Sequence, residues 1–109
     1  MKEILNYILT FFFPEKIHDI KFKNGKIRAL IKDPVANSWN TNTNIGYTEK
    51  NVIKYLNTNF LRNVYYLGSH QGIIPIILKK FYLKNSNFIC LEALKHNYEI
   101  SLKNKKING

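Results

Sequence analysis

The sequence is poor in the residues that build metal sites and disulfides, with one cysteine, Cys90, and three histidines in 109 residues. A single cysteine excludes an internal disulfide and any metal site made of several cysteines. The histidines, His18, His70 and His96, lack the spacing of zinc ligands. The lone thiol fits a reducing, cytoplasmic setting, and we expect it to be buried in the apolar run Phe88-Ile89-Cys90-Leu91.

Arginine is also scarce, because Arg28 and Arg62 are the only arginines among 17 basic residues. The formal net charge of +10 therefore comes almost wholly from lysine. Proteins that bind nucleic acids usually do so through the bidentate guanidinium groups of arginine. These lysines, in contrast, are spread along the chain without a dense basic block. An AT-rich genome, which favours Lys, Asn and Ile codons, is the simpler explanation. The alternative is a basic module that holds RNA or an acidic surface, because net charge acts at long range.

No apolar run reaches the ~20 residues that a membrane span needs. The most apolar stretch, residues 1–13, is interrupted by Asn6 and Thr10, and it carries Glu3 and no small-residue cleavage site, unlike a signal peptide. We expect an amphipathic helix that packs on the domain and ends before Pro14. The alternative is a helix that lies in a membrane interface, because three consecutive phenylalanines beside Lys16 suit a headgroup boundary.

The remaining composition, 45% hydrophobic and 22% charged, predicts one small folded domain. Residues 17–32 alternate apolar and polar positions around Asn24-Gly25, which predicts a β-hairpin with a type I′ turn. Asp33-Pro34 ends the second strand. A polar loop follows from Ala36 to Tyr47, and Trp39 is expected to anchor it to the body of the domain.

The second half of the chain has the pattern of a βαβα unit. Its predicted elements are a helix capped by Thr48 over 49–57, a strand over Val64–Leu67, a helix over Ile73–Leu83, a strand over Phe88–Leu91, and a helix over Lys95–Lys106 with Tyr98 and Leu102 facing inward. Continuous apolar strands are typical of a parallel sheet covered on both faces. A right-handed crossover places the loop after the first strand at the carboxyl ends of both strands.

That loop contains two glycines, Gly68 and Gly72, and the second strand ends at an acid, Glu92. Glycines let a ligand approach the backbone, the first turn of the helix offers N–H groups, and an acid about twenty residues onward accepts bonds from a ribose diol. The Gly-x-x-x-Gly spacing lacks the third glycine of a dinucleotide site, and no Walker lysine follows. S-adenosylmethionine, which has a ribose but no phosphate, suits this loop. The alternative is a purely structural role, in which the loop is a tight turn and Glu92 is a solvated helix cap.

Three segments of the sequence combine into a familiar pattern, namely Val64-Tyr-Tyr-Leu-Gly68-Ser-His-Gln-Gly72-Ile-Ile-Pro, Phe88-Ile-Cys-Leu-Glu92-Ala, and Asn97-Tyr98-Glu99-Ile100 with Asn104 and Asn108-Gly109. The pattern is similar to that of the FkbM family of methyltransferases over about two thirds of the chain. The resemblance implies that the cofactor-binding residues are Gly68, Ser69, His70, Gly72 and Glu92. It also places His70 beside the amino-acid end of S-adenosylmethionine. Two departures are Tyr66, where the family has an acid, and Ala93, where it has proline.

The resemblance implies methyl transfer from S-adenosylmethionine to an oxygen of a small molecule or glycan. It implies an α/β fold, an incomplete Rossmann-like sheet of parallel strands with flanking helices, preceded by an N-terminal helix and a β-hairpin. On this resemblance we expect residues 1–47 to form the lead-in and residues 48–109 to form the first half of the methyltransferase domain. Since the family's sheet continues beyond this point, we expect an N-terminal fragment without its catalytic residues, completed by a downstream polypeptide.

Overall fold

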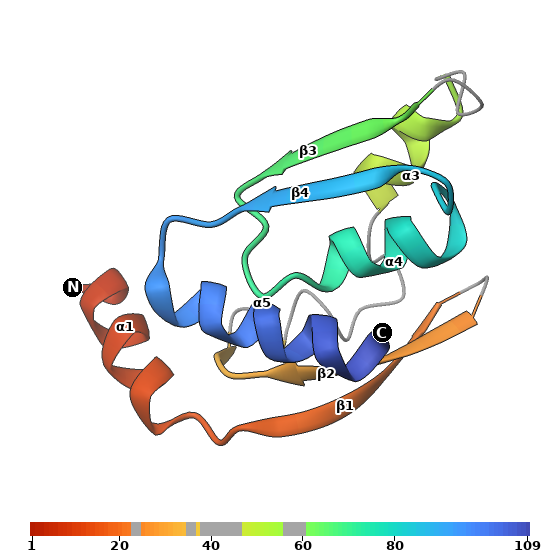
Figure 1. Ribbon diagram of the computed structural model, residues 1–109. Helices are drawn as coiled ribbons and strands as arrows, with labels where there is room; N and C mark the ends of the chain where they lie inside the picture. Colours follow the sequence, from red (N-terminus) through yellow and green to blue (C-terminus); the bar gives the residue numbers. More distant parts are fainter. Residues whose placement is uncertain (23–24, 35–36, 38–46, 56–60) are drawn as a thin grey trace.

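The computed structural model describes residues 1–22, 25–34, 37, 47–55 and 61–109. Trp39, most of its predicted loop, Lys23, Asn24 and Leu56 lie outside these residues. The elements are α1 (Lys2–Phe12), β1 (Lys16–Phe22), β2 (Gly25–Ile31), α3 (Tyr47–Ile53), β3 (Asn63–Leu67), α4 (Ile73–Phe81), β4 (Asn87–Leu91) and α5 (Lys95–Asn108). This is a mixed α/β fold in which α4 and α5 lie between the β3–β4 sheet and the β1–β2 hairpin (Figure 1).

The predicted hairpin is confirmed, since β1 and β2 pair in antiparallel register from Lys16 with Ile31 to Phe22 with Gly25. The prediction of Asn24-Gly25 as the two turn residues is wrong, because Gly25 is the first paired residue of β2. Tertiary packing explains why residue 25 is a glycine. A Cβ on Gly25 would lie 2.7 Å from Cε1 of Phe81, so the ring occupies the place of a side chain.

The main hydrophobic core joins the hairpin to α4. Its buried members are Ile20, Ile27, Ala29 and Ile31 of the hairpin with Ile73 and Ile77 of α4, and Ile74, Ile76, Phe81 and Tyr82 pack against them. The alternation of the hairpin therefore gives one face that packs on the helix layer. The helix begins after Gly72, as predicted, and ends at Phe81, two residues before the predicted Leu83.

Strands β3 and β4 pair in parallel, with Tyr65 beside Ile89 and Leu67 beside Leu91. These four side chains point to one face of the sheet, where they are 42–72% exposed. The alternate residues point toward the helices. The prediction of parallel strands is confirmed, but within the described residues only one face of this sheet is covered.

Three expectations about helices are wrong. The apolar residues Ile4, Leu5 and Phe12 of α1 are 65%, 56% and 81% exposed, so the helix does not bury its apolar face on the domain. In α5, Tyr98 and Leu102 are 48% and 44% exposed, and the buried residues are instead Asn97, Ile100 and Asn104. Helix α3 is shorter than predicted, since it spans Tyr47–Ile53. No helix in the described ranges is long and apolar enough to cross a membrane.

Candidate functional site

The loop between β3 and α4 is bonded to the end of β4. The backbone N–H groups of Gly68 and Ser69 both donate to the carbonyl of Leu91, at 2.9 and 3.0 Å. The N–H of Gly72 then donates to the carbonyl of Ser69 at 2.9 Å, which closes a tight turn. The loop therefore lies over the carboxyl edge of the β3–β4 pair, where ligands of open α/β sheets bind.

Glu92 connects this loop to the segment that follows β4. Its Oε2 accepts a hydrogen bond from the His70 N–H at 2.7 Å, and its Oε1 accepts one from the Leu94 N–H at 2.9 Å. The structure thus brings all five predicted site residues to one edge. The bond to Leu94 is a local turn contact and not a helix cap, since Leu94 is the N-cap residue of α5 and this helix has no side-chain cap bond. An ionised carboxylate has about four acceptor positions, so both oxygens keep capacity for another donor.

The two loop glycines have different surroundings. Gly68 has a φ of +68°, and a Cβ there would meet no atom within 4 Å, so its backbone faces open space. Gly72 has a φ of +80°, and a Cβ there would lie 3.0 Å from Cβ of Ser101 in α5. Left-handed backbone disfavours other residues at both positions. Gly68 therefore leaves room for a ligand, whereas Gly72 allows α5 to approach the start of α4.

A buried polar network supports the loop from the hairpin side, and the sequence did not reveal it. Gln71, which is 1% exposed, donates from Nε2 to Asp33 Oδ2 at 2.8 Å and to Asn97 Oδ1 at 3.4 Å. Its Oε1 accepts the backbone N–H of Lys32 at 3.1 Å. His70 Nε2 lies 3.7 Å from the same Asp33 Oδ2. The imidazole thus faces the hairpin end, and Asp33, predicted only to end a strand, is 5% exposed beneath the loop.

Asn104 of α5 completes this support along the outer edge of β2. Its Oδ1 accepts the Leu30 N–H at 2.6 Å, and its Nδ2 donates to the carbonyls of Leu30 at 2.9 Å and Gln71 at 2.8 Å. Asn108, one turn later, donates to the Arg28 carbonyl at 2.8 Å. Side-chain amides therefore satisfy backbone groups of this edge, and the edge strand is covered.

Tyr66, the residue of β3 two positions before Gly68, is bonded to a carboxylate from another element. Its hydroxyl donates to Glu49 Oε1 of α3 at 2.6 Å. Burial, and next the bond to Glu49, raise the pKa of Tyr66 well above its ordinary value, so the hydroxyl stays protonated. The strand that precedes the glycine loop thus has a carboxylate at its side, supplied by Glu49.

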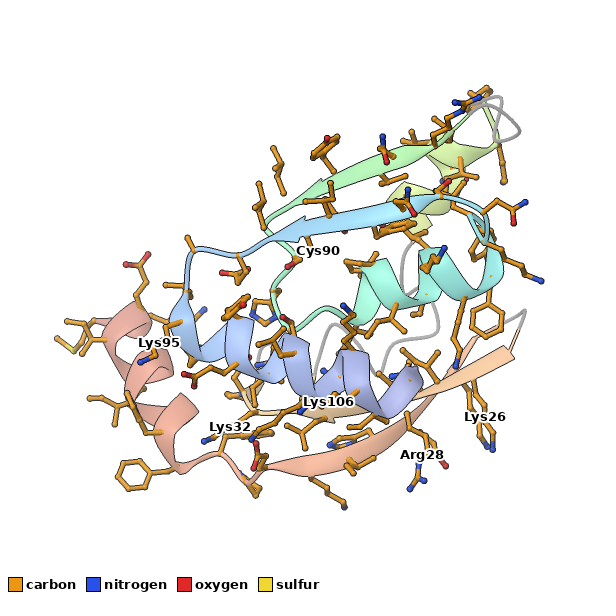
Figure 2. All side chains as sticks on the ribbon, in the orientation of Figure 1. Lys26, Arg28, Lys32, Cys90, Lys95 and Lys106 are labelled. Atoms are coloured by element: carbon orange, nitrogen blue, oxygen red, sulfur yellow. The ribbon has the colours of Figure 1, made fainter. Side chains whose placement is uncertain are left out.

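A cavity of about 440 Å³ lies next to the loop, between α4, β4 and α5. Ser69 and Gly72 line it together with Phe88, Cys90 and residues of both helices. The expectation of a buried Cys90 is wrong, since the thiol is exposed on this cavity, and Figure 2 labels the residue on β4. Partial burial still raises the pKa of Cys90, an effect that the charge of Lys105 opposes.

The site offers one carboxylate, Glu92, beside the open backbone at Gly68. Among the described residues, no group of three or more His, Cys, Asp or Glu side chains is placed to hold a metal ion. The open space at Gly68 and the Glu92 carboxylate suit a polar ligand that has hydroxyl donors, whereas the N–H groups of Gly68, Ser69, His70 and Gly72 are already bonded within the protein. Comparisons of the chain with protein-family models, curated proteins and solved structures give no match.

Proposed function

We propose that this chain binds S-adenosylmethionine at the carboxyl edge of β3 and β4, as the cofactor-binding part of a Rossmann-like methyltransferase that resembles the FkbM family. One observation carries the proposal. The His70 N–H donates to the Glu92 carboxylate at 2.7 Å, so the glycine loop and the acid that ends the next strand form one site. A nucleoside needs this combination, in which backbone approaches the ligand closely and a carboxylate accepts the ribose hydroxyls.

Each residue then has a defined part in binding. The free acceptor capacity of Glu92 takes the ribose hydroxyls, and the open backbone at Gly68 faces the ligand. The first-turn N–H groups of α4 face the carboxylate of the methionine moiety, which a helix N-terminus favours. Ser69 and Gly72 line the neighbouring cavity, and His70 contributes its backbone N–H to Glu92, because its imidazole faces Asp33. When bound, the cofactor supplies a methyl group on a sulfonium, and transfer depends on how the acceptor is positioned.

The acceptor, a small molecule or glycan, requires surfaces beyond this site. The uncovered face of the β3–β4 sheet, formed by Tyr65, Leu67, Ile89 and Leu91, supports the proposal that a further polypeptide completes the domain. Parallel strands are rarely stable with one face in water, and an apolar face of this kind favours a protein partner. The catalytic residues are proposed to belong to that polypeptide.

Thermal unfolding with S-adenosylmethionine or S-adenosylhomocysteine tests the proposal on the chain as it stands. At about 100 times Kd, a ligand stabilises the fold by ~2.7 kcal/mol, which raises Tm by roughly 10 °C at this size. Glu92→Gln should reduce this rise. Glu99→Gln, at an exposed acid on α5 paired with Lys95, should not.

Gly68→Ala gives a second and sharper test. Because a Cβ at Gly68 meets no protein atom, the variant should fold and lose only ~1–2 kcal/mol to left-handed strain, yet its new methyl group should weaken the cofactor response. A wild-type chain that shows no shift with either ligand would refute the proposal.

The net charge of +10 favours one second candidate, a basic module that binds RNA or an acidic surface. Titration of RNA binding against salt separates the two functions. Tight binding that falls steeply with salt, together with no response to S-adenosylmethionine, would favour the basic module. Binding of the cofactor that depends on Glu92 would favour the methyltransferase.

A further inference from the structure

Helix α1 carries an exposed apolar surface that neither the core nor the cofactor site uses. Its apolar residues Ile4, Leu5, Ile8, Leu9, Phe11 and Phe12 are 44–81% exposed. At 100° per residue, these positions fall within one half of the helix circumference, and Lys2 and Glu3 fall on the other half. An exposed apolar surface of this size on one helix is typical of an interaction site.

The charges around α1 identify the partner. The acid that follows the helix, Glu15, is paired with Lys103 at 2.5 Å, an interaction that lowers the pKa of Glu15. Lys16 comes next, and Figure 2 shows Lys32 at the same end of the molecule as α1, together with Lys95, which is paired with Glu99 at 3.9 Å. The apolar surface therefore lies in a cationic setting, on a chain of net charge +10.

We propose that α1 lies in the surface of an anionic lipid bilayer, with its apolar face between the acyl chains. An 11-residue helix is about 16 Å long, too short to cross the ~30 Å hydrocarbon layer, and it therefore lies in the plane of the interface. The apolar face supplies one binding signal, and the lysines supply the second through attraction to anionic headgroups. A second copy of this chain carries the same positive charge, so repulsion opposes pairing through this end.

Flotation with lipid vesicles tests the proposal. The wild-type chain should bind vesicles of equal parts phosphatidylglycerol and phosphatidylcholine, and should bind phosphatidylcholine alone far less. Leu5→Gln/Phe12→Gln removes two side chains from the middle of the apolar face and should lower partitioning by about a hundredfold. Leu102→Gln/Ile107→Gln is the matched control, because it replaces two exposed apolar residues of α5 and should leave vesicle binding unchanged.

A second variant, Lys16→Glu, tests the electrostatic signal while the apolar face stays intact. It should weaken binding to the anionic vesicles by severalfold, and added salt should reduce the difference from wild type. Circular dichroism establishes that each variant is folded. Equal vesicle binding by wild type and Leu5→Gln/Phe12→Gln would overturn the proposal. A wild-type dimer that this variant converts to a monomer would also overturn it, because a second copy would then cover α1.

Discussion

Asn104 is the residue whose replacement should reveal most clearly how this fold is held together. Its side chain is fully buried, and it bonds the backbone of Leu30 twice and the carbonyl of Gln71 once. Leucine has nearly the same volume, so Asn104→Leu leaves no large cavity. The substitution instead leaves one N–H and two carbonyl groups without their partner in the protein interior.

The expected loss follows from those three backbone groups. A buried donor or acceptor without a partner costs about 1–3 kcal/mol, and partial relaxation makes a total of about 3–5 kcal/mol reasonable. A chain of this size has a free energy of unfolding of about 5–15 kcal/mol, so the loss is a large share of it. The corresponding fall in Tm is roughly 10–20 °C.

Urea unfolding followed by circular dichroism measures this loss, with Asn108→Leu as the matched control. Asn108 lies on the same helix and bonds the same strand edge through the carbonyl of Arg28, but that bond is exposed. Water replaces it, so the control should lose about 1 kcal/mol or less. Equal losses in the two variants, or a loss below about 1 kcal/mol for Asn104→Leu, would refute the reasoning that buried amides hold the edge.

Three further predictions concern the loop, Tyr66 and Cys90. Gly72→Ala should destabilise the fold more than Gly68→Ala, because only its Cβ meets Ser101, at 3.0 Å, and equal urea midpoints would contradict this difference. The raised pKa of Tyr66 means that the unfolded chain releases this proton first, so stability should fall as pH rises above about 10. Tyr66→Phe should remove that part of the slope. Because its pKa is raised, Cys90 should react with iodoacetamide more slowly than a free thiol at about pH 8, and faster once urea unfolds the chain.

The elements that rest on local signals were predictable from the sequence. The alternation of apolar and polar residues predicted the hairpin. The change in the spacing of apolar residues at Val64 predicted the strand, loop and helix that follow. The approach of the glycine loop to Glu92 was also predictable, because neighbouring parallel strands end at the same edge of a sheet, and it needs no side-chain detail.

The contacts that fix the inner face of α5 were not predictable in this way. Its buried residues include Asn97 and Asn104, which give no hydrophobic periodicity, and Tyr98 and Leu102 suggested the wrong face. The partners of these asparagines are distant in sequence, as Leu30 lies 74 residues from Asn104. A helix that docks through amides is recognised only when the strand edge that it satisfies is known.

Large sequence separation also explains why the sequence did not reveal the polar network that supports the candidate site. Gln71 stands between two glycines in the loop, yet its partners Asp33 and Asn97 are 38 and 26 residues away. Local patterning predicted the candidate ligand-binding residues and gave no sign of the residues that hold the loop in place. Similarly, the amphipathic pattern of α1 predicted a helix but could not indicate that its apolar face is exposed.

The hairpin is therefore part of the scaffold of the loop. The carbonyl of Gln71 is fixed by Asn104, its side chain is fixed by Lys32 and Asp33, and both connections lead to β2 or its end. A loop held at backbone and side chain has lost much of its conformational freedom before any ligand arrives, so binding does not have to supply that ordering free energy. Under the proposed function, ligand affinity at Gly68 and Glu92 should consequently depend on a hairpin that lies on the far side of the helix layer from the sheet.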